Sequence, residues 1–228
     1  MLEIKEIKKS YGKKEVLKGI NLSAKKGDCI AIAGLNGCGK STLLSILGGT
    51  LKANSGEFYI NGVNILNDSK KRKGLIGYVP QENPLIDELS VRDNLKLWFC
   101  DSKLDMNEEL ESGVLKLLGV DKFVDMRVDR LSGGMKKRVS IGCSVAHDPA
   151  VLLLDEPSAA LDLECKESIK GFLIEHCKRD GIVLMTTHDE AELSFCNRLV
   201  VMREGVLTEE DKGLVGAELL KILKDGRK

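Results

Sequence analysis

One nine-residue segment constrains the fold of this chain more than any other feature. It reads Gly34-Leu35-Asn36-Gly37-Cys38-Gly39-Lys40-Ser41-Thr42 and fits the pattern G-x-x-x-x-G-K-[ST]. The wholly apolar run 29–33 precedes it, as expected of a strand buried on both faces, and residues 41–47 have helical character. A glycine-rich turn between a strand and a helix lets backbone N–H groups curl around phosphate oxygens. The segment therefore predicts a nucleoside triphosphate site, with Lys40 on the β- and γ-phosphates and the Ser41 hydroxyl on Mg²⁺.

The rest of the chain has an α/β pattern. Apolar residues interleaved with charged ones at 2–7 and 16–24 predict half-buried strands, and Asn61-Gly62 predicts a hairpin turn. Further strands are predicted by short apolar runs at 75–79, 151–154, 182–185 and 199–202. Helical stretches separate the later runs, which is the βαβ pattern of a mostly parallel sheet.

A helical region interrupts this core. Apolar residues recur every three to four positions within 90–118, and 132–146 has the character of another helix. We therefore expect one domain over 1–228. Within it, 1–80 and 150–228 form the core with its β subdomain, and 81–149 form a helical subdomain.

Composition excludes several functional classes. Lys and Arg together number 35, as do Asp and Glu, so the chain lacks the basic excess of a dedicated nucleic-acid binder. No uncharged apolar run approaches the ~18 residues that span a bilayer. The first residues also lack the apolar core of a signal peptide. We expect a cytoplasmic protein whose membrane role depends on a partner chain, with no nucleic acid bound.

The seven cysteines and three histidines do not predict a structural metal. The closest cysteine pair, Cys29 and Cys38, is nine positions apart, and the histidines do not pair at ligand spacing. An odd number of cysteines in a chain of cytosolic character indicates free, buried thiols. Cys38 itself is either a small residue filling a tight turn or a thiol activated by Lys40 and the helix N-terminus.

Two carboxylates follow the apolar run 151–154. Asp155 comes at the predicted end of a buried strand, where it suits an inner or outer ligand of Mg²⁺. Glu156 is one residue further on and can polarise an attacking water as a general base. A solvated loop pair has the same sequence, but beside the phosphate loop the pair indicates hydrolysis of the bound nucleotide.

Further segments resemble motifs of the ATP-binding-cassette (ABC) ATPases, in that family's order. They are Tyr11 before Gly12 (the aromatic that stacks on adenine), Tyr78-Val79-Pro80-Gln81-Glu82 (the glutamine loop), Leu131-Ser132-Gly133-Gly134-Met135 (the signature), Ser158-Ala159-Ala160-Leu161-Asp162 (the aspartate loop) and Thr186-Thr187-His188-Asp189 (the switch histidine). The joint match spans most of the chain. It implies a P-loop NTPase core with a mostly parallel sheet, an N-terminal antiparallel β subdomain and a helical insertion.

The resemblance also implies roles within one subunit. Tyr11 would stack on the adenine of ATP. Gln81 would touch Mg²⁺ and report the γ-phosphate to a membrane partner. His188 would hydrogen-bond the γ-phosphate and the attacking water.

Other roles implied by the resemblance cross a dimer. The hydroxyl of Ser132 and the N–H groups of Gly133 and Gly134 would face the γ-phosphate of ATP held by a second subunit. Two subunits, identical or related, would then close head to tail around two ATP molecules. Asp162 would help to couple the two sites.

One position departs from the family pattern. Residue 135 is Met where Gln is commonest, and a methionine side chain makes no strong hydrogen bond. Met135 and the basic run Lys136-Lys137-Arg138 are similar to the subgroup that serves drug, antibiotic and ion exporters. The run has a plainer interpretation too, a solvated helix face.

The resemblance favours one kind of ABC protein. A single phosphate loop excludes two-cassette translation factors, and the lack of a long heptad insertion excludes chromosome and DNA-repair ATPases. Only 40 residues follow His188, fewer than the regulatory domain of many sugar importers needs. We expect a free-standing ATP-hydrolysing subunit on the inner face of the membrane, docked on separate transmembrane chains and powering export. The stretch Pro84-Leu85-Ile86 with Leu89 is either a groove wall for a partner's helix or ordinary packing.

Two alternatives stay open. One is a soluble ABC ATPase that acts on protein complexes or in iron–sulfur cluster assembly. The other is an ATP-gated clamp with negligible turnover, which the intact Lys40, Asp155, Glu156 and His188 disfavour.

Overall fold

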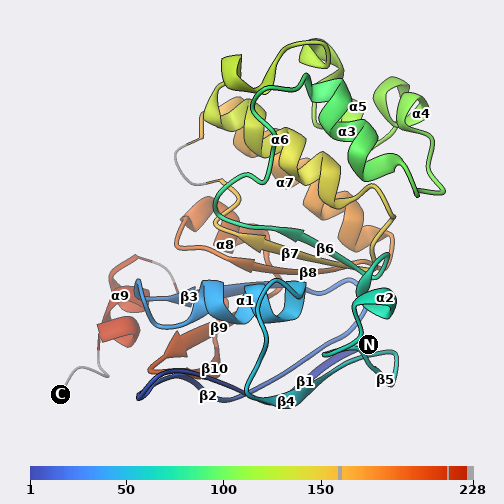
Figure 1. Ribbon diagram of the computed structural model, residues 1–228. Helices are drawn as coiled ribbons and strands as arrows, with labels where there is room; N and C mark the ends of the chain where they lie inside the picture. The colour runs from blue at the N-terminus through green and yellow to red at the C-terminus, as the bar shows by residue number, and fades with distance from the viewer. Residues whose placement is uncertain (159–160, 215, 225–228) are drawn as a thin grey trace.

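The computed structural model describes residues 1–158, 161–214 and 216–224 (Figure 1). Its strands are β1 (Leu2–Tyr11), β2 (Lys14–Ala24), β3 (Cys29–Gly34), β4 (Ser55–Ile60), β5 (Val63–Asn64), β6 (Ile76–Val79), β7 (Val151–Asp155), β8 (Ile182–Thr186), β9 (Arg198–Arg203) and β10 (Val206–Glu210). Its helices are α1 (Lys40–Gly48), α2 (Ser69–Arg72), α3 (Val91–Phe99), α4 (Met106–Glu111), α5 (Val114–Leu117), α6 (Gly133–Ser144), α7 (Leu163–Lys178), α8 (Glu190–Phe195) and α9 (Gly216–Lys224), with 3-10 turns at Val120–Phe123 and Val128–Arg130.

The strands form two sheets. The larger has the order β10-β9-β3-β8-β7-β6, and its neighbours are parallel except that β10 pairs with β9 in the antiparallel sense. The smaller sheet, β2-β1-β4-β5, is antiparallel throughout. The predicted α/β class with a mostly parallel sheet is confirmed.

Strand alternation separates two hydrophobic cores across the larger sheet. Ile30 and Ile32 of β3 pack on one face with the apolar side chains of α1 and of the smaller sheet. Ala31 and Ala33 pack on the other face with α3, α5, α6 and α7. Figure 1 shows the result, with α1 between the two sheets and the helical region above the larger one. A strand with helices on both faces has to be apolar throughout, as β3 is.

The predicted hairpin is confirmed. Ile60 pairs with Val63 around Asn61-Gly62. Both turn residues have positive φ, 51° and 78°, as a type I′ turn requires.

The helical region consists of short helices. Residues 90–118, which the sequence predicts to be helical in character, form three helices, because new N-termini interrupt the pattern. Asp105 begins α4 by accepting hydrogen bonds from the N–H groups of Asn107 and Glu108. Gly113 then separates α4 from α5.

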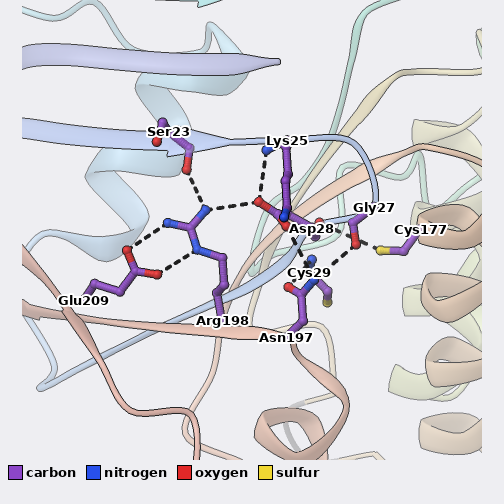
Figure 2. A network of polar contacts seen from close by, with 9 residues as sticks. All are labelled: Ser23, Lys25, Gly27, Asp28, Cys29, Cys177, Asn197, Arg198 and Glu209. Carbon is purple, nitrogen blue, oxygen red and sulfur yellow. Dashed lines mark hydrogen bonds and ion pairs between the residues drawn. The ribbon is translucent and has the colours of Figure 1, made fainter.

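A polar network joins the smaller sheet to the larger one (Figure 2). The Arg198 guanidinium makes two hydrogen bonds to the Glu209 carboxylate, at 2.8 and 2.9 Å. It also donates to Asp28 Oδ2 at 3.1 Å and to Ser23 O at 2.7 Å. Asp28 is buried, so Arg198 neutralises a charge that water does not reach.

The cysteines match the sequence expectation only in part. All seven thiols are free, but the prediction of burial is wrong for the exposed Cys100 and holds only partly for Cys38 and Cys177.

Across the described ranges, the helices all fall short of the length and apolar character needed to cross a membrane.

Candidate functional site

The phosphate loop lies between the end of β3 and the start of α1, as the sequence predicts. Gly37 and Gly39 have positive φ, 78° and 116°. A Cβ on Gly39 would lie 2.9 Å from Leu17 Cδ2 and 3.2 Å from Val16 O. The close approach of β2 and the backbone angle therefore both require glycine at 39.

Lys40 folds back across this loop. Its Nζ donates to Gly34 O at 2.8 Å and to Leu35 O at 3.3 Å. The Cys38 N–H also donates to Leu35 O, at 3.2 Å, which closes the turn. The ammonium group is thus held over the loop backbone.

A hollow of about 470 Å³ opens at this loop. It is lined by Tyr11, Lys14, Val16, Asn36, Gly37, Gly39, Lys40, Ser41, Thr42, Gln81 and Glu156. The structure therefore brings together residues predicted from four separate motifs. Lys14 is an additional cation that sequence reasoning missed, since a lysine at a strand start carries no motif.

Not every residue of the loop faces this hollow. Leu35 and Cys38 line a separate hollow of about 240 Å³ with Met202 and Leu223. Gly34 packs closely, because a Cβ there would lie 2.7 Å from both Cys38 Sγ and Met202 O. These residues shape the loop from behind.

Tyr11 ends β1 at the rim of the larger hollow. Half of it is exposed (50%), and Lys9 Nζ lies 5.3 Å from the ring centroid. An exposed ring of this kind offers a face for stacking.

The carboxylate pair stands where β7 ends beside β8. Asp155 is buried, and its Oδ1 accepts a hydrogen bond from Thr186 Oγ1 at 2.6 Å. The Glu156 N–H donates to the same Thr186 hydroxyl at 3.0 Å. Glu156 adopts a positive φ of 48°, uncommon for a non-glycine residue. Thr186 therefore holds the Asp155 carboxylate and the Glu156 main chain in place.

Gln81 and His188 reach Glu156 from two sides. Gln81 Nε2 donates to Glu156 Oε2 at 3.4 Å. His188 Nδ1 lies 3.9 Å from Glu156 Oε1, and 74% of the histidine side chain is exposed. Two residues predicted from separate motifs, Gln81 and His188, thus lie beside Glu156.

A smaller hollow of about 180 Å³ lies behind Glu156 and His188. Buried Glu192 lines it, and burial raises the pKa of that carboxyl against the opposing hydrogen bonds of Thr187 and Ser158. Sequence reasoning missed Glu192, which looks like one of several acidic residues on an exposed helix.

The signature residues lie apart from the phosphate-loop hollow of their own chain. Ser132 caps α6 by accepting a hydrogen bond from Met135 N–H at 3.3 Å, and it and Gly133 are exposed. Gly134 is buried against Cys165. None of Ser132, Gly133 and Gly134 is among the described residues that line the hollow with Lys40.

The predicted aspartate loop is described only in part. Asp162 caps α7 by accepting a hydrogen bond from Cys165 N–H at 2.8 Å. Ala159 and Ala160 of the motif lie outside the described residues.

The basic run on α6 is not a solvated face throughout. Lys136 makes a surface ion pair with Asp87, but Lys137 is buried, and that interpretation is wrong for it. Helical spacing could have indicated the burial of Lys137. It stands three residues after Gly134 and four before Ile141, which both lie on the buried face of α6.

The donors near the phosphate loop fit a magnesium ion. Ser41, Gln81 and Asp155 supply hydroxyl, amide and carboxylate oxygens, the ligands of a hard cation. Among the described residues, no group of three or more His, Cys, Asp or Glu side chains could hold a metal ion by itself. This suits Mg²⁺, which relies on substrate phosphates, waters and few carboxylates.

A phosphate loop after a buried strand, with paired carboxylates at a neighbouring strand end, defines the P-loop nucleoside triphosphatases. The ABC transporter family model matches residues 17–159. The chain therefore belongs to the ABC transporter family.

Similar curated proteins include ATP-binding subunits that are named for different kinds of transport. The linearmycin resistance ATP-binding protein LnrL of Bacillus subtilis (strain 168) is 34% identical, over 90% of this chain and 67% of its own length. The spermidine/putrescine import ATP-binding protein PotA of Spiroplasma citri is 37% identical, over 92% and 61%. The bacitracin export ATP-binding protein BceA of Halalkalibacterium halodurans is 33% identical, over 93% and 89%. The chain thus spans about three fifths to two thirds of the length of the first two relatives.

A solved structure agrees with the fold. A dimeric post-hydrolysis state of an ATP-binding cassette, bound to ADP and Pi, is 30% identical with a TM-score of 0.83. The match covers 93% of this chain and 99% of that one. The fold is thus that of an ABC ATPase, with its mostly parallel sheet and antiparallel β subdomain. The relatives include both importers and exporters, so the expected exporter subgroup is not resolved.

Proposed function

We propose that this chain binds ATP with Mg²⁺, hydrolyses it, and thereby powers export through separate transmembrane chains. The observation that carries the proposal is that Glu156 lines the same hollow as Lys40 and Ser41. A base within reach of a phosphate loop is what hydrolysis needs beyond binding.

The loop residues bind the nucleotide. Backbone N–H groups of 36–42 surround the phosphates, Lys40 binds the β- and γ-phosphates, and Tyr11 stacks on adenine. Ser41, Gln81 and Asp155 would hold Mg²⁺, which when bound neutralises charge on the phosphate oxygens.

Glu156 then acts as the general base. It accepts a proton from the water that attacks the γ-phosphorus, and Gln81 and His188 orient that water and the γ-phosphate. Phosphoryl transfer needs little covalent help, so positioning and charge stabilisation supply most of the rate.

Ser132, Gly133 and Gly134 act on a second subunit. They lie at the exposed N-terminus of α6. The positive end of the helix dipole there favours an anion. A head-to-tail dimer, homomeric or heteromeric, places this N-terminus on the γ-phosphate of the partner's ATP, with Asp162 coupling the sites. The similar ATP-binding cassette, which was solved as a dimer, supports this arrangement.

The helical region, 81–149, carries the contact with the membrane chains. A hollow of about 400 Å³ lies between this region and the core, lined by α1, α2, β6, α3 and α6. Leu97 and Trp98 line it and are substantially exposed, at 54% and 39%. An exposed apolar groove of this kind fits a cytoplasmic helix of a transmembrane chain.

The stretch that the sequence offers as either a groove wall or ordinary packing lies elsewhere. Pro84, Leu85, Ile86 and Leu89 are not among the described residues that line this hollow, and Leu85 packs against the core of the helical region. We therefore place the docking surface on α3. A docked subunit would lie on the inner face of the membrane, without nucleic acid.

Affinity purification from detergent-solubilised native membranes tests the proposal. The wild-type chain should recover a multi-span protein at equal stoichiometry, and Leu97→Asp should lose it. Leu117→Asp is the control, because Leu117 is also substantially exposed (47%) in the same region but does not line the groove. Recovery of soluble partners alone would favour the assembly ATPase, and absence of phosphate release would favour the clamp. Transport assays in vesicles holding the recovered partner then decide between export and import, where Met135 supports export.

A further inference from the structure

Lys137 is a buried cation that the proposed chemistry does not use. It is 5% exposed, and its Nζ donates to Pro80 O and to Gln81 O, both at 3.0 Å. Burial lowers the pKa of the ammonium group, while Asp155 and Glu156 oppose that shift. A buried ammonium is costly unless its hydrogen bonds are made, so these two carbonyls stabilise it where it lies.

The two carbonyls belong to the turn that brings Gln81 to Glu156. β6 ends at Val79, and the side chain of Gln81 donates to Glu156 Oε2 at 3.4 Å. Lys137 therefore holds the main chain of the same residue whose side chain touches the general base. Two successive carbonyls on one ammonium fix both the position and the orientation of this peptide unit.

Lys137 also belongs to the helix that carries the signature. It comes five residues after Ser132, about one and a half helical turns along α6. The backbone hydrogen bonds of a helix fix the spacing between its residues. Lys137 is thus a direct polar link between the exposed N-terminus of α6 and the Gln81 main chain.

We propose that Lys137 is a positioning residue for ATP hydrolysis, which passes displacements of the signature helix to the Gln81–Glu156 contact. This inference rests on the proposed function, because it takes Glu156 as the base. Binding of a partner subunit's ATP at Ser132 would then shift the Gln81–Glu156 contact of this chain. A residue that acts through position should change turnover and leave ATP binding in place.

The test compares three variants of the full chain. Lys137→Met keeps an unbranched side chain, one atom shorter than lysine, and removes every donor. Lys137→Gln has as many side-chain atoms in line as methionine but keeps an N–H donor at the end. Lys136→Met is the matched control, because it removes the neighbouring lysine and only a surface ion pair with Asp87.

Lys137→Met should lower kcat about tenfold, the effect of losing a charge-assisted hydrogen bond, with KM for ATP nearly unchanged. Lys137→Gln should recover part of this loss, and Lys136→Met should match the wild type. Hydrogen–deuterium exchange should rise selectively in 80–88 of Lys137→Met. If that variant does not fold, Lys137→Gln is judged against the wild type by the same two measurements.

A folded Lys137→Met with wild-type kcat and wild-type exchange would overturn the inference, as would a uniform rise in exchange across the chain. Failure of the proposed function gives a different result. In that case the wild type releases no phosphate, or Glu156→Gln releases it normally. If Glu156→Gln stops turnover while folded Lys137→Met does not slow it, only the role of Lys137 is rejected.

Discussion

Gln81 and Glu156 are 75 positions apart in the sequence, yet Gln81 Nε2 donates to Glu156 Oε2 at 3.4 Å. Each residue follows the carboxyl end of a strand, β6 or β7, and the two strands are parallel neighbours. Parallel strands deliver the residues after them to the same edge of a sheet, where ligands of open α/β folds bind. The contact therefore follows from the topology. In addition, Lys137 binds the Gln81 carbonyl and Thr186 binds the Glu156 N–H.

Substitution of Gly39 by Ala should impair nucleotide binding. The residue would adopt a φ of 116° with its Cβ 2.9 Å from Leu17 Cδ2. The strain is about 1–3 kcal/mol, so either the free energy of unfolding falls or the loop changes shape and ATP affinity drops about tenfold or more. Titration with a fluorescent ATP analogue and urea unfolding measure both quantities.

Gly171→Ala is the matched control for Gly39→Ala. Gly171 lies within α7 with nothing within 4 Å of an added Cβ. Because alanine is the better helix former, unfolding should become harder by about 0.5–1 kcal/mol, with ATP affinity unchanged. Wild-type ATP affinity together with an undiminished free energy of unfolding in Gly39→Ala would contradict the account of the loop.

Arg198→Met should destabilise the fold strongly. The change leaves Asp28 buried without its cation and also frees Glu209. Breaking a buried pair from one side costs about 3–5 kcal/mol in the free energy of unfolding. Lys26→Met, which breaks an exposed pair with Asp180, should cost under about 1 kcal/mol by the same denaturation assay. If Arg198→Met lowers the free energy of unfolding as little as Lys26→Met does, the network in Figure 2 does not stabilise the connection between the sheets.

His176 should make stability depend on pH between about 4 and 6.5. Burial lowers the pKa of this imidazole to about 4, with a smaller contribution from Arg179. Since the ordinary pKa is about 6.5, the unfolded chain binds more protons in this window. The contribution of His176 to the free energy of unfolding is therefore fully present above about pH 6.5. It falls by about 3 kcal/mol in total as the pH drops towards 4.

His176→Leu should remove that part of the pH dependence. Urea unfolding at a series of pH values measures it, and His147→Leu, at a partly exposed site, should keep the wild-type dependence. An unchanged slope in His176→Leu would mean that other groups cause the acid sensitivity.

The sequence was most informative where function requires a local pattern. The phosphate loop, the hairpin and the carboxylate pair depend on neighbours within a few residues, and the structure places each at the predicted element. The βαβ pattern predicted parallel strands, although not their order in the sheet.

Features made by distant residues were not predictable. Arg198 and Asp28 are 170 positions apart, and neither belongs to a motif. β10 was missed because an exposed edge strand carries little apolar signal. The burial of Lys137 could be expected from its helical spacing to Gly134 and Ile141, but its partner, the Pro80–Gln81 turn about 57 residues away, could not.

The central claim is that Glu156 is the base for ATP hydrolysis, and Glu156→Gln tests it most directly. The variant keeps the shape of the side chain but cannot take the proton. Phosphate release should therefore fall about a hundredfold or more, and light scattering should show an ATP-dependent dimer. Glu82→Gln, an exposed neighbour of Gln81, is the control and should behave as the wild type. Near wild-type phosphate release from Glu156→Gln, with no trapped dimer, would contradict the account.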